Sequence, residues 1–257
     1  MFPILFHLGP LTIRTYGAMV AMAFLASLHA ARLAAHARRI GEAFLLDLVA
    51  ILIVSGLLGA RSLYVLLNLS YFRQHPWESV KVWEGGLVFY GGFLLAALVG
   101  MIFTRYRGYP LEDVADCLAP GLALGQGIGR WGCFFAGCCY GKPTSLPWGI
   151  TFKDPAALAP LGVKLHPVQI YESIGTLALA AWLWYLLIRR RETHGEVFWL
   201  YLLFYGILRF MMETLRGDDR GAVIGGLAPS QIIALAAILI SGSILLVKKT
   251  AHHDAHA

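Results

Sequence analysis

The sequence predicts an all-α polytopic membrane protein, and two observations lead to this fold class. Of its 257 residues, 58% are hydrophobic and only 14% are charged, whereas soluble domains carry about 25% charged residues. In addition, apolar stretches of about 20 residues, the length of a helix that crosses a bilayer, recur along the chain. We therefore expect about seven transmembrane helices in one membrane domain over residues 1–249, followed by a disordered, histidine-containing tail over 250–257.

The expected spans follow one another with mostly short connections. They cover residues 12–32, 43–69, 86–106, 111–130, 167–188, 197–215 and 228–247. The fourth is the least apolar, because Asp113, Asp116 and Pro120 interrupt it. The N-terminus has neither a basic segment nor a clear cleavage site, so the first span is expected to direct insertion without being removed.

The placement of basic residues predicts the orientation in the membrane. Ten of the 21 Lys and Arg residues follow spans one, three, five and seven, and seven lie in the longer loops of the opposite side. The positive-inside rule then places the N-terminus outside and the C-terminus inside. The functional segments should lie on the outer side, which carries an aromatic stretch at 70–86, a Pro- and Gly-rich loop at 131–166 and a polar turn at 216–227.

Residues 129–141, at the end of the fourth span, combine an arginine, three cysteines and four glycines. An arginine inside a bilayer is costly unless an anionic group or a cavity accommodates it, which makes Arg130 a candidate site residue. Glycines such as Gly132 and Gly141 allow a ligand to approach the backbone closely.

The four cysteines, Cys117, Cys133, Cys138 and Cys139, do not have the spacing of a metal site. They contain no C-x-x-C pair, and no histidine lies at ligand spacing from them, so we expect neither a metal nor another cofactor. Cys133 and Cys138 lie near the expected outer face, where either a disulfide or the packing of small side chains would explain them.

The sixth span ends with charged residues on one helix face. Arg209, Glu213 and Arg216 are spaced i, i+4 and i+7, and an ion pair between Arg209 and Glu213 would lower the cost of burying both charges. Two arginines for one carboxylate leave positive charge that would hold a phosphate. A structural ion-pair network is the alternative interpretation.

The fifth span begins with polar residues. Pro167 suits a first helical position, and His166, Gln169 and Ser173 then share a face, with Glu172 beside it. His166 would serve as a base, or these groups would form a helix cap with interhelical hydrogen bonds.

Further polar side chains are expected on the same side of the membrane. Tyr16 and Tyr90 lie at the outer starts of spans one and three, and Arg61 lies in the outer half of span two. The tyrosines would otherwise be ordinary interfacial aromatics. An excess of buried positive charge indicates an anionic ligand, and in a membrane the nearest is a phospholipid headgroup.

Together these segments resemble the bacterial prolipoprotein diacylglyceryl transferases. The resemblance rests on the order of residues 14–17, 85–92, 129–132, 166–172 and 209–216. It implies a seven-helix inner-membrane enzyme whose active site faces outward. Such an enzyme transfers the diacylglyceryl group of phosphatidylglycerol to the lipobox cysteine in the signal peptide of a preprolipoprotein, releasing glycerol phosphate. The implied partners are these two substrates and membrane lipids, without nucleic acid.

The resemblance and the chemistry of the residues together define the candidate site. The candidate catalytic residues are Arg130, Arg209, Glu213 and His166. The candidate residues for binding and positioning the headgroup are Tyr16, Arg61, Tyr90, Gly132, Gly141, Gln169, Glu172 and Arg216.

The chain departs from the family's pattern at four positions. Cys133 and Ala136 stand where the family has asparagines, Cys138 stands where it has a glutamate, and Tyr90 stands where it has a histidine. Because a tyrosine is a poor base at neutral pH, the family's base is not transferred to Tyr90. Two alternatives therefore remain, namely a phospholipid-dependent transferase with another acceptor and a non-catalytic phospholipid-binding or transport protein.

Overall fold

Long helices dominate the computed structural model, which describes residues 3–8, 11–189, 194–218 and 225–254. The long helices in these ranges are α1 (Thr15–Ala37), α2 (Glu42–Leu67), α4 (Phe89–Tyr106), α5 (Leu111–Ala136), α6 (Val168–Arg189), α7 (Glu196–Leu215) and α8 (Pro229–Asp254). All except α5 are long and apolar enough to cross a membrane. The all-α polytopic fold is thus confirmed, and the expected fourth span is a continuous 26-residue helix with Pro120 inside it.

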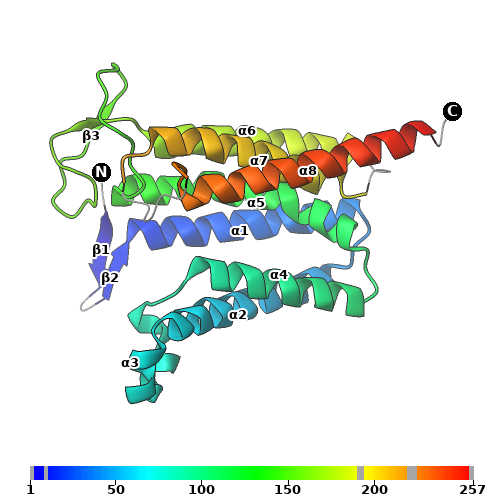
Figure 1. Cartoon of the computed structure of the whole chain (residues 1–257), viewed down its shortest axis with the longest axis horizontal. Helices are drawn as coiled ribbons and strands as arrows, with labels where there is room; N and C mark the ends of the chain where they lie inside the picture. Colours follow the sequence, from blue (N-terminus) through cyan, green and yellow to red (C-terminus); the bar gives the residue numbers. More distant parts are fainter. Residues whose placement is uncertain (1–2, 9–10, 190–193, 219–224, 255–257) are drawn as a thin grey trace. The chain divides into compact units, whose positions relative to one another are not determined.

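The chain divides into two compact units, which are described separately. Unit 1 comprises Met1–Ala34 and Ala115–Ala257, and unit 2 comprises Ala35–Val114. Unit 1 holds most of α1 and α5 together with α6, α7 and α8, which run alongside one another in Figure 1. That the two units form one domain over 1–249 stays a prediction.

Helix α5 packs closely against two neighbours in unit 1, because its faces carry glycines. A side chain at Gly121 would lie 2.8 Å from the carbonyl oxygen of Ser27 in α1. On another face, a side chain at Gly127 would lie 2.7 Å from Leu177 of α6. The Ser173 hydroxyl of α6 donates to the Gly127 carbonyl at 2.8 Å. Small residues and interhelical hydrogen bonds of this kind hold helices together where apolar burial gives little driving force.

A buried carboxylate fixes the start of α7. Asp116 of α5 is fully buried, and its two oxygens accept hydrogen bonds from the backbone N–H groups of Gly195 at 2.9 Å and Phe198 at 2.8 Å. The first N–H groups of a helix have no partner inside the helix and favour a negative charge, so Asp116 acts as a cap supplied by another helix. The acidic residue that interrupts the fourth span therefore has a structural partner.

Two antiparallel strand pairs accompany the helices of unit 1. Strands β1 (Ile4–Leu8) and β2 (Leu11–Arg14) precede α1, so the first helix begins at residue 15 rather than at the expected residue 12. Strands β3 (Ile150–Thr151) and β4 (Lys164–Leu165) lie between α5 and α6. The segment expected as a loop over 131–166 therefore begins later, at residue 137, and has its own small core of Phe152, Ala159 and Leu165.

Unit 2 is built on the packing of α2 against α4 through glycines. A side chain at Gly92 would lie 2.7 Å from the carbonyl oxygen of Gly56. Between these helices the chain forms α3 (Leu69–Gln74) and the 3₁₀ helices η1 (Pro76–Val80) and η2 (Val82–Glu84). Of the aromatic side chains expected at a membrane interface, Trp77 and Trp83 are 82% and 75% exposed, whereas Phe72 is buried, with 7% exposed.

Helix α8 continues to Asp254, so the expected tail over 250–257 begins as part of this helix. Residues 255–257, with His256, lie outside the described residues, as do Arg190, Arg191 and Arg220, which entered the count of basic loops. The orientation expected from that count stays a prediction.

Candidate functional site

Three helices of unit 1 contribute the four residues of a buried arginine–carboxylate cluster: Arg130 of α5, Glu172 of α6, and Arg209 and Glu213 of α7. Nη2 of Arg130 pairs with Oε1 of Glu172, while Nη1 of Arg209 lies 3.7 Å from its Oε2. Nη2 of Arg209 lies 2.8 Å from Oε2 of Glu213, as the i, i+4 spacing predicted. Glu172, which is only 1% exposed, therefore joins the two arginines.

The position of the cluster follows from the packing of α5 on α6. Gly127 lies about one helical turn before Arg130, and Ser173 directly follows Glu172. The close contact at Gly127 and the hydrogen bond from Ser173 to its carbonyl oxygen bring Arg130 and Glu172 together. Gly127 and Ser173 thus position the ion pair without carrying charge.

The charges around the cluster are balanced, contrary to the expected excess of positive charge. Arg216 forms two hydrogen bonds with the carboxylate of Asp218, both at 2.9 Å. Arg130, Arg209 and Arg216 are thus matched by Glu172, Glu213 and Asp218 among the described residues. The excess was expected because Glu213 was the one carboxylate assigned to these arginines, whereas Glu172 and Asp218 also pair with them.

Binding capacity remains in individual N–H groups. The Nη1 atoms of Arg209 and Arg216 are both buried and have no hydrogen-bond partner in the described part of the chain. Buried donors are nearly always paired in proteins, so these two atoms mark places where a ligand or solvent oxygen would bind.

The chain after α5 connects the start of α6 to the end of α7. The N–H of Gly141 donates to the carbonyl oxygen of His166 at 3.2 Å, and the N–H of Lys142 donates to that of Leu215 at 2.8 Å. Gly141 also forms an isolated antiparallel bridge with Arg216. A side chain at Gly141 would lie 2.6 Å from the Cβ atom of His166, so only glycine fits. This pairing brings three of the expected site residues, Gly141, His166 and Arg216, together.

Other expected site residues of unit 1 adjoin the same region. Nε2 of Gln169 donates to the carbonyl oxygen of Cys138 at 2.8 Å. Gly132 packs against α1, where an added side chain would lie 3.3 Å from the carbonyl oxygen of Tyr16. Nδ1 of His166 is buried without a hydrogen-bond partner among the described residues. These positions agree with a shared site, and their roles in binding or catalysis stay predictions.

In unit 2, Arg61 has a different set of partners. Its Nε donates to the carbonyl oxygen of Ser79 at 2.7 Å, its Nη1 to that of Gly85 at 2.7 Å, and its Nη2 to that of Glu78. The guanidinium thus holds the turns between α3 and α4. Tyr90, at the start of α4, is about half exposed. The expected roles of Arg61 and Tyr90 in substrate binding stay predictions.

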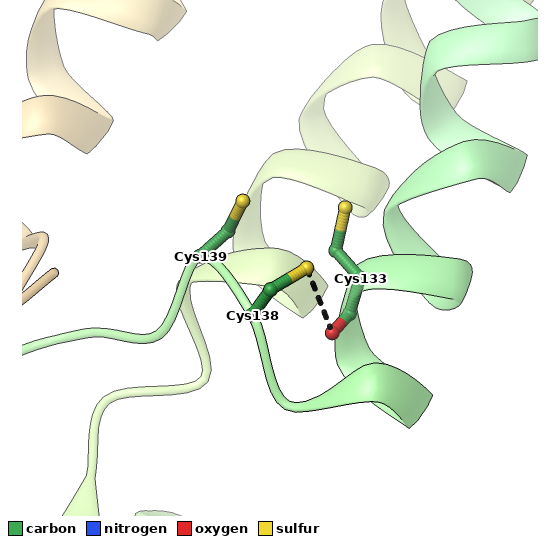
Figure 2. Close-up of side chains that lie close together, drawn as sticks. All are labelled: Cys133, Cys138 and Cys139. Carbon is green, nitrogen blue, oxygen red and sulfur yellow. Dashed lines mark hydrogen bonds between the residues drawn. The ribbon is translucent and has the colours of Figure 1, made fainter. Parts of the chain in front are cut away.

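Three cysteines converge at the end of α5, as Figure 2 shows. The N–H of Gly137 donates to the carbonyl oxygen of Phe134, and that of Cys138 to the carbonyl oxygen of Cys133. These two bonds form a Schellman motif, with Gly137 in the left-handed region at φ 71°. The motif folds Cys138 back over Cys133, and the Sγ atoms of Cys133, Cys138 and Cys139 lie within 4.8 Å of one another.

All three thiols are free. The pKa of the Cys139 thiol is lowered, first by hydrogen bonding with Cys133 and Cys138 and then by the guanidinium groups of Arg216 and Arg130. The convergence of the three thiols was not predicted from the sequence, because the cysteines do not have C-x-x-C spacing. The signal available in the sequence was Gly137, which ends the helix between the first cysteine and the other two.

An apolar groove lies between α6 and α7, next to the arginine–carboxylate cluster. It has a volume of about 410 Å³ and is lined by Gly175, Ala178, Leu179, Trp182, Phe204 and Leu208. Leu208 directly precedes Arg209, and Gly175 lies about one turn after Glu172. Trp182 is 39% exposed and Phe204 is 42% exposed, so the groove opens on the surface of unit 1.

The apolar helices and the cluster define a polytopic membrane protein with paired arginines and carboxylates inside its helical unit. The family model for prolipoprotein diacylglyceryl transferase matches residues 3–247, and the chain belongs to this family.

Curated relatives agree with this assignment. The chain is 39% identical over 241 residues to the phosphatidylglycerol–prolipoprotein diacylglyceryl transferase of Clostridium tetani, covering 93% of this chain and 95% of the relative. It is 35% identical over 246 residues to the enzyme of that name from Trichormus variabilis, with 93% and 86% covered. The enzyme of that name from Geobacter sulfurreducens is 35% identical over 243 residues, with 93% and 92% covered.

Proposed function

We propose that this protein transfers the diacylglyceryl group of phosphatidylglycerol to the lipobox cysteine of preprolipoprotein signal peptides. A C–S thioether bond forms at the glyceryl carbon, the C–O bond to phosphate breaks, and glycerol phosphate leaves. The observation that carries this proposal is the arginine–carboxylate cluster, in which the buried Nη1 atom of Arg209 has no hydrogen-bond partner among the described residues. Membership of the family supports the choice of substrates.

The cluster suits a phosphate that gains charge during the reaction. The phosphodiester of the donor lipid carries one negative charge, and the departing phosphate monoester carries up to two. Guanidinium groups form strong, charge-assisted hydrogen bonds with phosphate oxygens. Arg130 and Arg209 are held in place by Glu172 before the lipid binds, so their donors need little reorganisation as the charge develops.

Glu172 and Glu213 are positioning residues in this proposal. Their charges keep the resting cluster neutral and direct the guanidinium groups. Without them, two cations would be buried with no counter-charge, at a cost of several kcal/mol. His166, whose Nδ1 is buried and unpaired among the described residues, is a candidate for accepting the proton of the acceptor thiol.

The groove between α6 and α7 is the proposed site for an acyl chain of the donor. Its wall begins at Leu208, next to Arg209, and continues to Trp182 and Phe204. A lipid whose phosphate meets the arginines would therefore place an acyl chain along this apolar wall. The groove and the cluster together would select a molecule that is anionic at one end and apolar at the other.

We also propose that the protein lies in the bacterial inner membrane, with its N-terminus and its site on the outer side and its C-terminus inside. The bias of basic residues toward the connections after alternate spans supports this orientation. Reporter fusions after residues 107 and 249 would test it, because both should report the cytoplasmic side. A periplasmic signal from either fusion would reject the topology.

The proposed activity is tested with purified protein in detergent, phosphatidylglycerol labelled in its acyl chains and a synthetic lipobox peptide. We expect label on the peptide, and none on a peptide whose cysteine is replaced by serine. Label on neither peptide, in a preparation that still consumes the lipid, would indicate another acceptor. A protein that binds the lipid without consuming it would contradict the transferase assignment altogether.

A further inference from the structure

The thiol cluster, Cys133, Cys138 and Cys139, presents three soft ligand atoms at one point of unit 1. The three Sγ atoms lie within 4.8 Å of one another, and Figure 2 shows them at the C-terminal end of α5. Cys139 has a φ of 59°, in the left-handed region that non-glycine residues seldom adopt. This unusual backbone directs a third thiol toward the two that the Schellman motif brings together.

The separation of the sulfurs is close to that of a metal site. Zinc binds thiolates tetrahedrally at about 2.3 Å, which places the sulfurs about 3.8 Å apart. Shifts of about 1 Å would therefore complete the arrangement. Cys138 and Cys139 are half-buried and lie on a turn, where such shifts are easily made, whereas Cys133 is buried in the helix.

A disulfide accounts for the geometry less well. Sγ of Cys138 is directed at the carbonyl oxygen of Cys133, 3.7 Å away, rather than at its sulfur. A disulfide requires an S–S distance of about 2.05 Å, and it would leave the third thiol without a function. A metal site that uses all three sulfurs as ligands explains better than a disulfide why the three side chains meet at one point.

We propose that the thiol cluster binds one zinc ion through its three sulfurs and that the fourth position of the metal takes the thiol of the acceptor cysteine. Zinc sites with three protein ligands and one open position are the catalytic type. The second half of this inference rests on the proposed function, because it supplies the acceptor thiol.

The surroundings fit such a site electrostatically. Three thiolates and one Zn²⁺ carry one net negative charge. Arg130 lies one turn before Cys133 in α5, and Arg216 pairs through its backbone with Gly141, two residues after Cys139. These cations would stabilise the negative metal site and would bring the phosphate of the donor lipid close to it.

The proposed reaction has two steps, activation of the acceptor thiol and its attack on the lipid. The acceptor thiol replaces a hydroxide on zinc and becomes a thiolate, because a thiol that coordinates zinc is deprotonated. In this route the hydroxide, and not His166, takes the proton and leaves as water. The thiolate attacks the glyceryl carbon that carries the phosphate ester. The C–S bond forms, the C–O bond breaks, and its electron pair leaves with glycerol phosphate.

Metal content is measured first, on the full chain purified in detergent after growth with zinc. We expect about one zinc per chain and an X-ray absorption shell of three sulfurs at about 2.3 Å. A protein without bound zinc that has either three titratable thiols or a disulfide within the cluster would overturn the proposal.

Single variants identify the ligands. Each of Cys133→Ser, Cys138→Ser and Cys139→Ser should lower the zinc affinity at least about tenfold, since even losing an outer partner of a ligand has such an effect. Cys117→Ser is the matched control, because Cys117 is buried elsewhere in α5 and does not belong to the cluster, and it should keep its zinc. Equal zinc content in all four variants would refute the assignment.

The open position is tested by adding the lipobox peptide without any lipid. A fourth sulfur should enter the zinc shell, and a peptide with serine in place of cysteine should leave the shell unchanged. An unchanged shell with the cysteine peptide would overturn the acceptor role.

These measurements do not require transfer of the diacylglyceryl group, so the zinc proposal and the proposed function can fail independently of each other. Zinc with a fourth sulfur but no labelled peptide in the lipid assay would reject the proposed function alone. A full transfer rate in zinc-free protein would reject the role of zinc alone.

Discussion

Arg61 and Arg130 are both arginines within apolar helices, yet their surroundings differ. In unit 2, Arg61 donates to the backbone carbonyl oxygens of Ser79, Gly85 and Glu78. In unit 1, Arg130 pairs with the carboxylate of Glu172, which Arg209 also contacts. These carbonyl oxygens belong to the folded backbone, so the hydrogen bonds of Arg61 hold the turns between α3 and α4 and leave it few donors for a ligand. A carboxylate that two arginines contact can release part of either one to a phosphate. From this difference in partners, and not from burial, we infer a structural role for Arg61 and a phosphate-binding role for Arg130.

The largest effect on activity is expected for Arg130→Ala. Loss of one preorganised donor to a developing oxyanion costs about 10²–10³-fold in rate. Glu172 keeps Arg209 as a partner, so the variant should still insert and fold. Transfer to the lipobox peptide and thermal unfolding in detergent are the two measurements. Full activity in Arg130→Ala would remove the phosphate role of this residue.

Glu213→Gln should have a smaller effect on the same cluster. It removes the ion pair at 2.8 Å with Arg209, which retains only the longer contact with Glu172. A hydrogen bond to a charged group contributes about 1.5–3 kcal/mol, so we expect a loss of activity of roughly tenfold to a hundredfold. Glu213→Asp, which keeps the charge, is the control and should retain more activity. Equal rates in both variants and the unchanged protein would show that Glu213 does not position Arg209.

Arg61→Ala tests the other side of the comparison. It leaves several carbonyl oxygens without their charged donor, and we expect the free energy of unfolding to fall by about 2–3 kcal/mol. Activity per folded molecule should change by less than about threefold, because a structural role acts through stability. Arg61→Lys, which restores a cation without the planar fork, should recover only part of the stability. A specific loss of lipid binding in folded Arg61→Ala would instead establish the headgroup role predicted from the sequence.

Asp116→Asn should give the smallest effect. The amide keeps one oxygen for the N–H groups of Gly195 and Phe198 but loses the charge that favours the start of α7. The charge at a helix N-terminus contributes about 0.3–1 kcal/mol, up to about 2 kcal/mol when buried. One of the two N–H groups also loses its acceptor, because the NH2 group of Asn only donates, so the unfolding free energy should fall by about 2 kcal/mol. Transfer activity should be unchanged when measured well below the unfolding temperature. A large loss of activity would show that the ion pairs depend on how α7 begins.

The helices and much of the ion-pair cluster were predictable, because both follow from short-range patterns. Runs of apolar residues predicted all seven long helices of the described ranges, six of which are apolar enough to cross a membrane, and the i, i+4 spacing predicted the pair of Arg209 with Glu213. Contacts between distant segments were not predictable in this way. Glu172 neutralises Arg130 across 42 residues of sequence through the packing of α5 on α6. Asp218 is only two residues from Arg216, but their pairing depends on the turn after α7, which the helical spacing does not describe.

The thiol cluster was also not predictable from a local spacing pattern. Its cysteines are close in sequence, but they meet only because Gly137 ends α5 with a Schellman motif and Cys139 adopts a left-handed backbone. The spacing of the cysteines alone predicted no metal site. The glycine between them was the better indicator that their side chains meet, since it reverses the chain over so few residues.

The groove between α6 and α7 opens on the surface of unit 1, where Trp182 and Phe204 are partly exposed. A lipid that enters by this route arrives by lateral diffusion in two dimensions and never crosses water. The enzyme then responds to the mole fraction of phosphatidylglycerol in its bilayer and not to the amount in the vessel. Diluting that lipid with a zwitterionic one at constant total lipid should slow the reaction, whereas adding more vesicles of the same composition should not speed it up.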